Sequence, residues 1–168
     1  MNKCIFLDRD GVLNVERGDY TYLPEDFILA EGVPEAIKKI KDAGYLAIVV
    51  TNQSGITKGI YTRAQMQGCH EILMEKTNYL IDKIYYCPYH PAFSASLSRK
   101  PDTLMLEKAI AKFNIDPKQS WLVGDHCRDI QSGKKMGLKT VLVTIHENNE
   151  CHPELKSSSL LEAINNIL

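Results

Sequence analysis

The sequence lacks a large excess of charge of either sign, and this removes the usual basis for binding polyanions. Its 168 residues contain 20 lysines and arginines against 21 aspartates and glutamates, which gives a formal net charge of −1. Binding to nucleic acid or to an anionic membrane depends mainly on clustered positive charge, and no run of Lys and Arg indicates such a cluster. We therefore expect neither nucleic acid nor a membrane as a partner.

Long apolar runs and an even set of cysteines are also missing. No apolar run approaches the length that spans a bilayer, and the N-terminal "MNKCIFLDRD" reaches acidic residues too early for a signal peptide. The five cysteines are odd in number and scattered, which is typical of reduced thiols and not of a disulfide framework. We expect a cytoplasmic protein in which Cys4 and Cys127 are small buried residues.

What is present is typical of one globular domain, residues 1–168, with 44% hydrophobic and 24% charged residues. Short, mostly continuous apolar runs alternate with helical patterns, and there are no repeats. The expected strands are Lys3–Leu7, Tyr45–Thr51, Lys83–Tyr86, Ser120–Val123 and Lys139–Thr144. The expected helices are Pro34–Ala43, Thr62–Tyr79, Asp102–Phe113, Asp129–Met136 and Ser159–Ile167.

This alternation predicts an α/β fold, a Rossmann-like doubly wound parallel sheet with helices on both faces. The letters "TRAQ" from Thr62 predict a capping box, and Asp102 after a proline is expected to cap the next helix. The least regular stretches are Glu16–Phe27, Pro88–Ser98 and His146–Ser158.

Polar residues follow several of the expected strands, at the edge where ligands bind in open parallel sheets. Burying carboxylates there is costly unless a cation or hydrogen bonds compensate them, so the pattern indicates a site. The residues concerned are Asp8 and Asp10 after the first strand, Thr51–Ser54 at the second, Asp125 and Asp129 after "WLVGD", and Lys100 before a helix.

The residue types narrow the chemistry. Three carboxylates from different segments suit a hard cation such as Mg²⁺. A lysine and a threonine hydroxyl beside it can hold phosphoryl oxygens, which leaves one carboxylate free to attack phosphorus. A second aspartate two residues on can protonate the leaving oxygen and then activate water.

Four motifs carry a resemblance to a known superfamily. "FLDRDGV", "VVTNQSG", "RKP" and "VGDHCRD" resemble, in order, the motifs of the haloacid dehalogenase superfamily of aspartate-nucleophile phosphatases. More narrowly, "FLDRDGVLN", "TNQSGI", "YYCPYHP" and "RKPDTLML" resemble the D-glycero-D-manno-heptose 1,7-bisphosphate 7-phosphatases and the related histidinol-phosphate phosphatases. The resemblance extends roughly from Lys3 to Thr144.

The resemblance implies a role for each matching residue. Asp8 is expected as the nucleophile and Asp10 as the general acid and base. Mg²⁺ is expected on the Asp8 side chain, the Asp10 main-chain carbonyl and Asp125, while Thr51 and Lys100 hold the phosphoryl group. The intervals between these motifs are too short for a large cap domain, so we expect a capless enzyme.

The resemblance also implies the substrate contacts, which we expect from Glu16, Arg17, Gly18, Asp19, Asn52, Gln53, Ser54, Arg99 and His126. His126 stands where the family often has lysine, and an imidazole grips an anion less firmly at pH 7. Asp129 has two open interpretations. It either orients a metal-bound water or Lys100, or it only supplies a favourable charge at a helix N-terminus.

One loop departs from the family pattern. The related families carry a Cys-x-His pair and then a Cys-x-Cys pair that bind zinc before "RKP". Here Cys87 remains, but Tyr89, Ser96 and Ser98 occupy the other ligand positions. Cys87 and His90 are two residues where tetrahedral zinc needs four ligands, so we expect no structural zinc.

The resemblance implies a Mg²⁺-dependent phosphatase that removes the 7-phosphate of a small sugar phosphate, D-glycero-D-manno-heptose 1,7-bisphosphate, through an aspartyl-phosphate. Because the domain is small, we expect a monomer. Histidinol-phosphate phosphatase is the alternative within the same enzyme class. A DNA 3′-phosphatase is disfavoured by the balanced charge. A catalytically inactive binding module is disfavoured because the catalytic residues are present.

Overall fold

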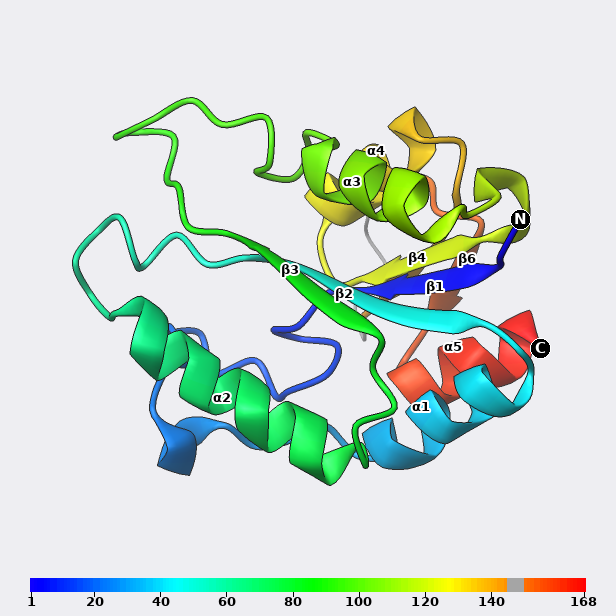
Figure 1. Ribbon diagram of the computed structural model, residues 1–168, viewed down its shortest axis with the longest axis horizontal. Coiled ribbons are helices and arrows are strands. Elements are labelled where there is room, and N and C mark those ends of the chain that lie inside the picture. Colours follow the sequence, from blue (N-terminus) through cyan, green and yellow to red (C-terminus); the bar gives the residue numbers. More distant parts are fainter. Residues whose placement is uncertain (145–149) are drawn as a thin grey trace.

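A computed structural model describes residues 1–144 and 150–168 of the protein. The sheet is parallel throughout, with the strand order β3-β2-β1-β4-β5-β6 (Figure 1). The strands are β1 Cys4–Leu7, β2 Leu46–Asn52, β3 Lys83–Cys87, β4 Trp121–Gly124, β5 Lys139–Val143 and β6 Leu155–Ser157. The α-helices are α1 Val33–Asp42, α2 Arg63–Lys76, α3 Leu104–Phe113, α4 Cys127–Lys135 and α5 Leu160–Ile167, with 3-10 turns at Pro24–Asp26 and Pro117–Gln119.

Helices cover both faces of the sheet. Helices α1, α2 and α5 lie on one face and α3 and α4 on the other, while both chain ends lie away from the carboxyl end of β1 (Figure 1). Side chains along a strand point alternately to the two faces. Accordingly, Ile5 and Leu7 of β1 pack in the core under α1, α2 and α5, whereas Cys4 and Phe6 pack in the core under α3.

The predicted doubly wound α/β fold is confirmed, and all five predicted strands form. A sixth strand, β6, was missed because it falls in the stretch His146–Ser158 that was predicted to be irregular. Its three residues are too few to give a periodic signal, and Lys156 in its middle is exposed. The start of that stretch, including His146, lies outside the described residues.

Two predicted helix starts have different outcomes. The capping box at Thr62 is confirmed, because its hydroxyl accepts from the Gln65 amide and the Gln65 side chain accepts from the Thr62 amide. The predicted cap at Asp102 is wrong. Helix α3 begins at Leu104 after Thr103, and the Asp102 carboxylate lies 3.7 Å from Lys135 Nζ instead.

The expectation of reduced cysteines is wrong for one pair. Cys127, at the start of α4, and Cys151, shortly before β6, form a disulfide with a Cα–Cα distance of 5.3 Å. The two cysteines are 24 residues apart, and the disulfide ties the start of α4 to the segment before β6. Cys127 is therefore half-buried and paired, whereas Cys4, Cys69 and Cys87 are buried free thiols.

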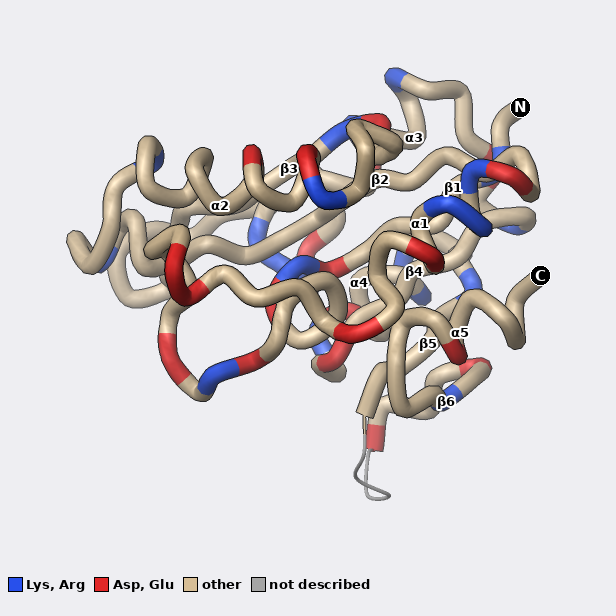
Figure 2. Tube along the Cα trace, turned by 90° about the horizontal axis from the view of Figure 1, so that it is seen from below, with Lys and Arg blue, Asp and Glu red and all other residues tan. Residues whose placement is uncertain are grey.

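Acidic and basic residues are interspersed along the trace, as Figure 2 shows. Within the described ranges, no helix is long and apolar enough to cross a membrane. The two connections in which a large cap would be inserted, from β1 to β2 and from β2 to β3, contain only loops, one 3-10 turn and helices α1 and α2. The site at the sheet edge is therefore framed by short loops.

Candidate active site

The carboxyl ends of β1, β2 and β4 bring the predicted catalytic residues together. Asp8 follows β1 directly, Thr51 is the penultimate residue of β2, and Asp125 follows β4. Lys100 reaches the same point from the loop before α3. Because parallel strands end at one edge of the sheet, side chains far apart in the sequence share one site there.

Lys100 is the fixed positive charge of this site. Its side chain is 1% exposed, and Nζ lies 2.9 Å from Asp8 Oδ1 and 2.6 Å from Asp129 Oδ1. It also donates to the carbonyl of Val50 at 2.8 Å. Burial alone would lower the pKa of Lys100, but Asp129 and Asp8 outweigh it and raise the pKa above its ordinary value. The ammonium is thus held charged against the Asp8 carboxylate.

The backbone of Lys100 is held by Asn52. The Asn52 amide donates to the Lys100 carbonyl and accepts from the Lys100 amide, each at 3.1 Å. Both ends of the Asn52 side chain are therefore used to tie the Lys100 loop to β2. Sequence reasoning gave Asn52 a substrate contact only and missed this pairing.

Three carboxylates lie close enough to share a cation. Ligand oxygens of Asp8, Asp125 and Asp129 all lie within 4.8 Å of one another, and Asp125 Oδ1 is buried without a hydrogen-bond partner. Burial, with added repulsion from neighbouring aspartates, raises the pKa of Asp8 to about 6 and of Asp125 to about 8. A divalent cation would compensate these charges, so the donor set fits Mg²⁺.

The chain passes this cluster at a glycine whose backbone conformation and surroundings disfavour a side chain. Gly11 has a φ of +80°, and a Cβ added there would lie 2.2 Å from Asp125 Oδ2. The glycine in "DRDGV" therefore lets the Asp10 loop approach the carboxylate of Asp125.

Asp10 is held by a network of side chains above Asp8. Asp10 Oδ1 accepts from Arg9 Nη2 at 2.8 Å, and Oδ2 accepts from Gln53 Nε2 at 2.9 Å. The same Gln53 nitrogen contacts Thr51 Oγ1 at 2.9 Å, and Gln53 Oε1 accepts from the Tyr61 hydroxyl at 2.6 Å. The network fixes the direction of the Asp10 carboxylate toward the cleft.

Arg9 anchors this network, and sequence reasoning missed its role. Its side chain is 1% exposed and donates to the Thr21 carbonyl at 2.8 Å, with Nη1 at 3.5 Å from His70 Nε2. Burial, then the nearby charge of Arg9, lowers the pKa of His70 to about 4. The only available sequence signal was the position of an arginine between two aspartates at the end of a buried strand.

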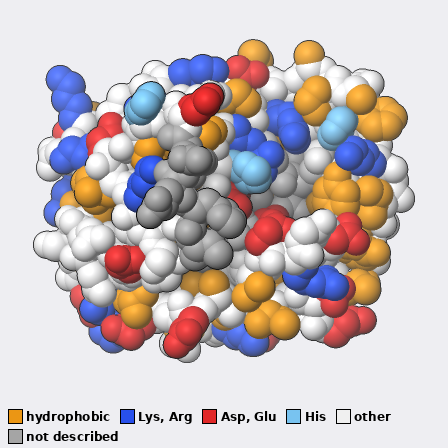
Figure 3. All heavy atoms as spheres, turned by 180° about the vertical axis from the view of Figure 1, so that it is seen from behind, with side chains coloured by type: hydrophobic (Ala, Val, Ile, Leu, Met, Phe, Trp, Pro, Cys, Tyr) orange, Lys and Arg blue, Asp and Glu red, His pale blue; other side chains and the backbone are white. Residues whose placement is uncertain are grey.

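A cleft of about 540 Å³ opens over these residues. Figure 3 shows basic and histidine side chains gathered around a hollow on this face. Of the predicted substrate residues, the cleft is lined by Glu16, Gly18, Asp19, Asn52, Gln53, Ser54, Arg99 and His126. Arg17 is absent from the lining and pairs with Asp26 at 2.6 Å. Sequence reasoning missed Lys58, Tyr61, His90 and Arg128.

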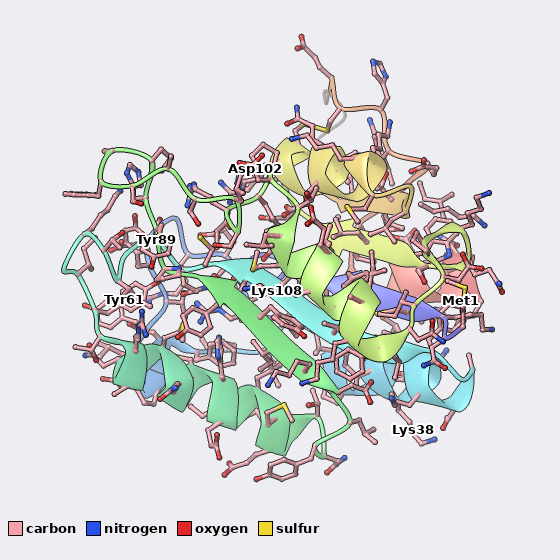
Figure 4. All side chains as sticks on the ribbon, turned by 45° about the horizontal axis from the view of Figure 1, so that its top comes forward. Met1, Lys38, Tyr61, Tyr89, Asp102 and Lys108 are labelled. Atoms are coloured by element: carbon pink, nitrogen blue, oxygen red, sulfur yellow. A yellow bond between two sulfur atoms is a disulfide. The ribbon has the colours of Figure 1, made fainter. Side chains whose placement is uncertain are left out.

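The loop after β3 is held by hydrogen bonds at the positions where the related families have zinc ligands. The Cys87 thiol contacts Ser96 Oγ at 3.9 Å, and Ser96 Oγ lies 2.7 Å from Ser98 Oγ. Arg99 Nη1 donates to the Tyr89 carbonyl at 3.2 Å. Figure 4 shows Tyr89 on this loop and Tyr61 before α2 at the same end of the molecule, so the loop borders the cleft.

With the geometry established, similarity to known proteins identifies the family. The chain is 39% identical over 172 residues to the D-glycero-beta-D-manno-heptose-1,7-bisphosphate 7-phosphatase of Haemophilus ducreyi, covering 96% of this chain and 94% of that protein. The chain belongs to the heptose 1,7-bisphosphate 7-phosphatase family.

Further similarities agree with this family. The D-glycero-alpha-D-manno-heptose-1,7-bisphosphate 7-phosphatase of Campylobacter jejuni is 37% identical, over 88% of this chain and 86% of the relative. The crystal structure of the heptose bisphosphate phosphatase from B. bronchiseptica, complexed with magnesium and phosphate, has a TM-score of 0.88 at 25% identity, covering 98% of this chain and 97% of the other. The HAD-hydrolase-like family model matches residues 97–159. The resemblance inferred from the four motifs is confirmed.

Proposed function

We propose that the protein is a Mg²⁺-dependent phosphatase that removes the 7-phosphate from D-glycero-D-manno-heptose 1,7-bisphosphate. The observation that carries the proposal is the buried contact of Lys100 with Asp8, two residues before Asp10, whose side chain lines a cleft that also contains four basic residues. The heptose bisphosphate phosphatases to which the chain is similar supply the substrate. They include enzymes for the alpha and for the beta anomer, so kinetics with each anomer decides between the two.

Asp8 is proposed as the nucleophile. Its carboxylate oxygen forms a bond to phosphorus as the bond from phosphorus to the C7 oxygen breaks, which gives an aspartyl-phosphate. Lys100 and the Thr51 hydroxyl hold the phosphoryl oxygens as negative charge shifts onto them. The 2.9 Å contact between Lys100 Nζ and Asp8 Oδ1 keeps the lysine ammonium beside the reacting carboxylate.

Asp10 is proposed as the acid and base. It donates a proton to the departing sugar oxygen and later takes a proton from the water that cleaves the aspartyl-phosphate. Its side chain is 28% exposed and lines the cleft, while Arg9 and Gln53 hold its two oxygens. The carboxylate can therefore reach substrate without losing its orientation.

The Asp8 side chain, the Asp10 main-chain carbonyl and Asp125 are proposed to hold Mg²⁺, which supplies positive charge to the transferring phosphoryl group. Asp129 is proposed to position Lys100. Its Oδ1 pairs with Lys100 Nζ at 2.6 Å and its Oδ2 accepts from the His126 amide at 3.0 Å, so both oxygens already have partners.

Metal analysis tests the cofactor proposal. EDTA is expected to abolish phosphate release and Mg²⁺ to restore it, while zinc gives no gain. The hydrogen bonds among Cys87, Ser96 and Ser98 support the proposal that this loop keeps its conformation without bound zinc. Stoichiometric zinc in the purified protein, measured by mass spectrometry of the metal, would contradict that part of the proposal.

Steady-state kcat/KM over a panel of phosphate esters tests the substrate. The heptose 1,7-bisphosphate is expected to be the best substrate, ahead of histidinol phosphate, nucleotides and 3′-phosphorylated DNA. A preference for histidinol phosphate would favour the alternative enzyme, and no turnover of any ester would favour an inactive binding module. We also propose a cytoplasmic, monomeric enzyme formed by one domain, to be checked by fractionation and analytical ultracentrifugation.

A further inference from the structure

A buried tyrosine stands behind the side chain that holds Asp10. Tyr61, labelled in Figure 4, precedes α2 and is 4% exposed. Its hydroxyl donates to Gln53 Oε1 at 2.6 Å, and Gln53 Nε2 donates to Asp10 Oδ2 and to Thr51 Oγ1, each at 2.9 Å. Tyr61 is therefore linked through one amide to two groups of the proposed mechanism.

The ring of Tyr61 is fixed from several sides. It stacks on Tyr22, with ring centroids 5.1 Å apart and an interplanar angle of 11°, and Tyr20 packs against it at 5.8 Å. A Cβ added at Gly55 would lie 2.1 Å from Tyr61 Cε1, so the loop backbone passes directly against the ring. Burial raises the pKa of Tyr61 well above its ordinary value, so the phenol keeps its proton and acts as a donor.

The phenol determines which end of the Gln53 amide faces Asp10. Gln53 Oε1 is the only acceptor that the Tyr61 hydroxyl has in the part of the chain that the structure describes. Turning the amide over would leave this buried O–H without an acceptor and would place a carbonyl oxygen against the Asp10 carboxylate. Both changes are unfavourable, so the contact with Tyr61 keeps the amide nitrogen toward Asp10.

The two oxygens of Asp10 have different surroundings. Oδ1 accepts from Arg9 Nη2 at 2.8 Å, from Arg9 Nε at 3.2 Å and from Asn14 Nδ2 at 3.1 Å, whereas Oδ2 accepts, among the described residues, from Gln53 Nε2 alone. Donors favour the ionised form of an oxygen, so Oδ2 is the one that can carry a proton. Because Gln53 offers it a donor and not an acceptor, that proton cannot bind to Gln53 and points into the cleft.

We infer that Tyr61 is a positioning residue, which acts through Gln53 to direct the proton on Asp10 Oδ2 to the leaving oxygen of the substrate. The inference deepens the proposed function and rests on it. As the bond from phosphorus to the C7 oxygen breaks, the C7 oxygen takes the proton from Oδ2 and leaves as a hydroxyl group. Oδ2 is then ionised and takes a proton from the water that cleaves the aspartyl-phosphate.

Two esters that differ in their leaving group test the inference. The sugar oxygen of the heptose 1,7-bisphosphate needs a proton as it departs, whereas the weakly basic p-nitrophenolate of p-nitrophenyl phosphate departs without one. For both esters, kcat/KM from single-turnover reactions with excess enzyme reports the transfer of phosphate to Asp8. The ratio of the two values cancels effects on Thr51 and Lys100, because these groups act on both esters.

Tyr61→Phe removes the hydroxyl and keeps the stacked ring. The ratio of kcat/KM for the heptose bisphosphate to that for p-nitrophenyl phosphate is expected to fall by about 10-fold, mainly through kcat, and Asp10→Asn is expected to lower it by about 100- to 10,000-fold. Tyr22→Phe removes the same group from the neighbouring ring, which does not line the cleft, and is expected to leave the ratio unchanged.

The possible outcomes separate this inference from the proposed function. A lower ratio in Asp10→Asn with an unchanged ratio in Tyr61→Phe, or a loss in Tyr61→Phe confined to KM, overturns the inference while the acid role of Asp10 stands. Equal losses on both esters in Asp10→Asn overturn that acid role and the inference with it. Circular dichroism melting of each variant establishes that the compared proteins are folded.

Discussion

At the scale of single residues, the site depends on how the positive charge of the buried Lys100 is compensated. Lys100 contacts Asp8 and Asp129; burial lowers its pKa, and both carboxylates raise it. Removing one partner of a buried charge group is costly when the remaining charges no longer cancel. Here a second aspartate remains beside the lysine, so the chemistry of Asp8 can be tested without losing the fold.

Asp8→Asn is the first residue-scale prediction. The amide cannot form an acyl phosphate in the way a carboxylate does, so phosphate release is expected to fall by at least about 10⁴-fold. The unfolding midpoint is expected to change little, because Asp129 still neutralises Lys100. Single-turnover phosphate release measures the first effect, and Asp42→Asn on exposed α1 serves as the control. Turnover close to that of the control would refute the nucleophile.

Asn52→Ala is the second residue-scale prediction. The loss of two 3.1 Å hydrogen bonds to the Lys100 backbone is expected to displace the lysine and to reduce kcat by about 10- to 100-fold, with a smaller change in KM. Asn52→Asp keeps one of the two contacts, so its kcat is expected to lie between those of the wild type and Asn52→Ala. A change confined to KM would assign Asn52 to substrate contact instead of positioning.

Sequence reasoning succeeded at this scale where position along a strand was enough. Asp8, Thr51 and Asp125 come at strand ends, so their convergence follows from a parallel sheet alone. The side-chain contacts around the site could not be predicted in the same way. Those of Gln53 with Asp10 and of Asn52 with Lys100 depend on loop geometry, which the sequence does not specify. The interaction of Arg9 with the Thr21 carbonyl is of the same kind.

At the scale of elements, mostly continuous apolar runs predicted the five longer strands. Four of them, β1, β2, β4 and β5, are buried along most of their length, whereas the edge strand β3 is mainly half-buried. The short strand β6 lacks such a run, since its pattern is half-buried, exposed and buried over three residues. The cap of α3 was misplaced because Asp102 has the preferred residue type but binds elsewhere. Element boundaries therefore depended on contacts that residue type does not specify.

The link between α4 and the segment before β6 gives an element-scale prediction. The Cys127–Cys151 disulfide closes a loop over a sequence separation of 24, and such a cross-link stabilises a fold by about 3 kcal/mol in the chain-entropy view. Cys151→Ser is therefore expected to lower the free energy of unfolding in urea by about that amount. Reductant is expected to destabilise the wild type and to leave the variant unchanged.

Thiol counting under denaturing conditions checks the same link. Without reductant, alkylation is expected to label Cys4, Cys69 and Cys87 only, and after reduction it labels all five. Labelling of five thiols before reduction would contradict the disulfide. No spacing in the sequence indicated this pair, since it depends on the tertiary structure that places the start of α4 beside the segment before β6.

At the scale of the whole molecule, a buried neutral histidine couples stability to pH. His70 on α2 is 8% exposed and faces the Arg9 guanidinium, and burial together with that charge lowers its pKa from 6.5 to about 4. Between these two values the unfolded chain binds a proton that the folded protein does not. The stability from neutral His70 is complete above about pH 6.5 and is lost progressively as the pH falls toward 4.

His70→Gln removes this titration while keeping an amide that can accept from Arg9. The wild type is expected to lose about 2 kcal/mol more of its unfolding free energy between pH 7 and pH 5 than the variant loses. Urea denaturation at several pH values measures the difference, and His152→Gln, at an exposed position, provides the matched control. Parallel pH profiles for wild type and His70→Gln would contradict this prediction, because they would mean that the folded protein tolerates a protonated His70 ring beside Arg9. The Arg9 network would then hold Asp10 without requiring a neutral histidine.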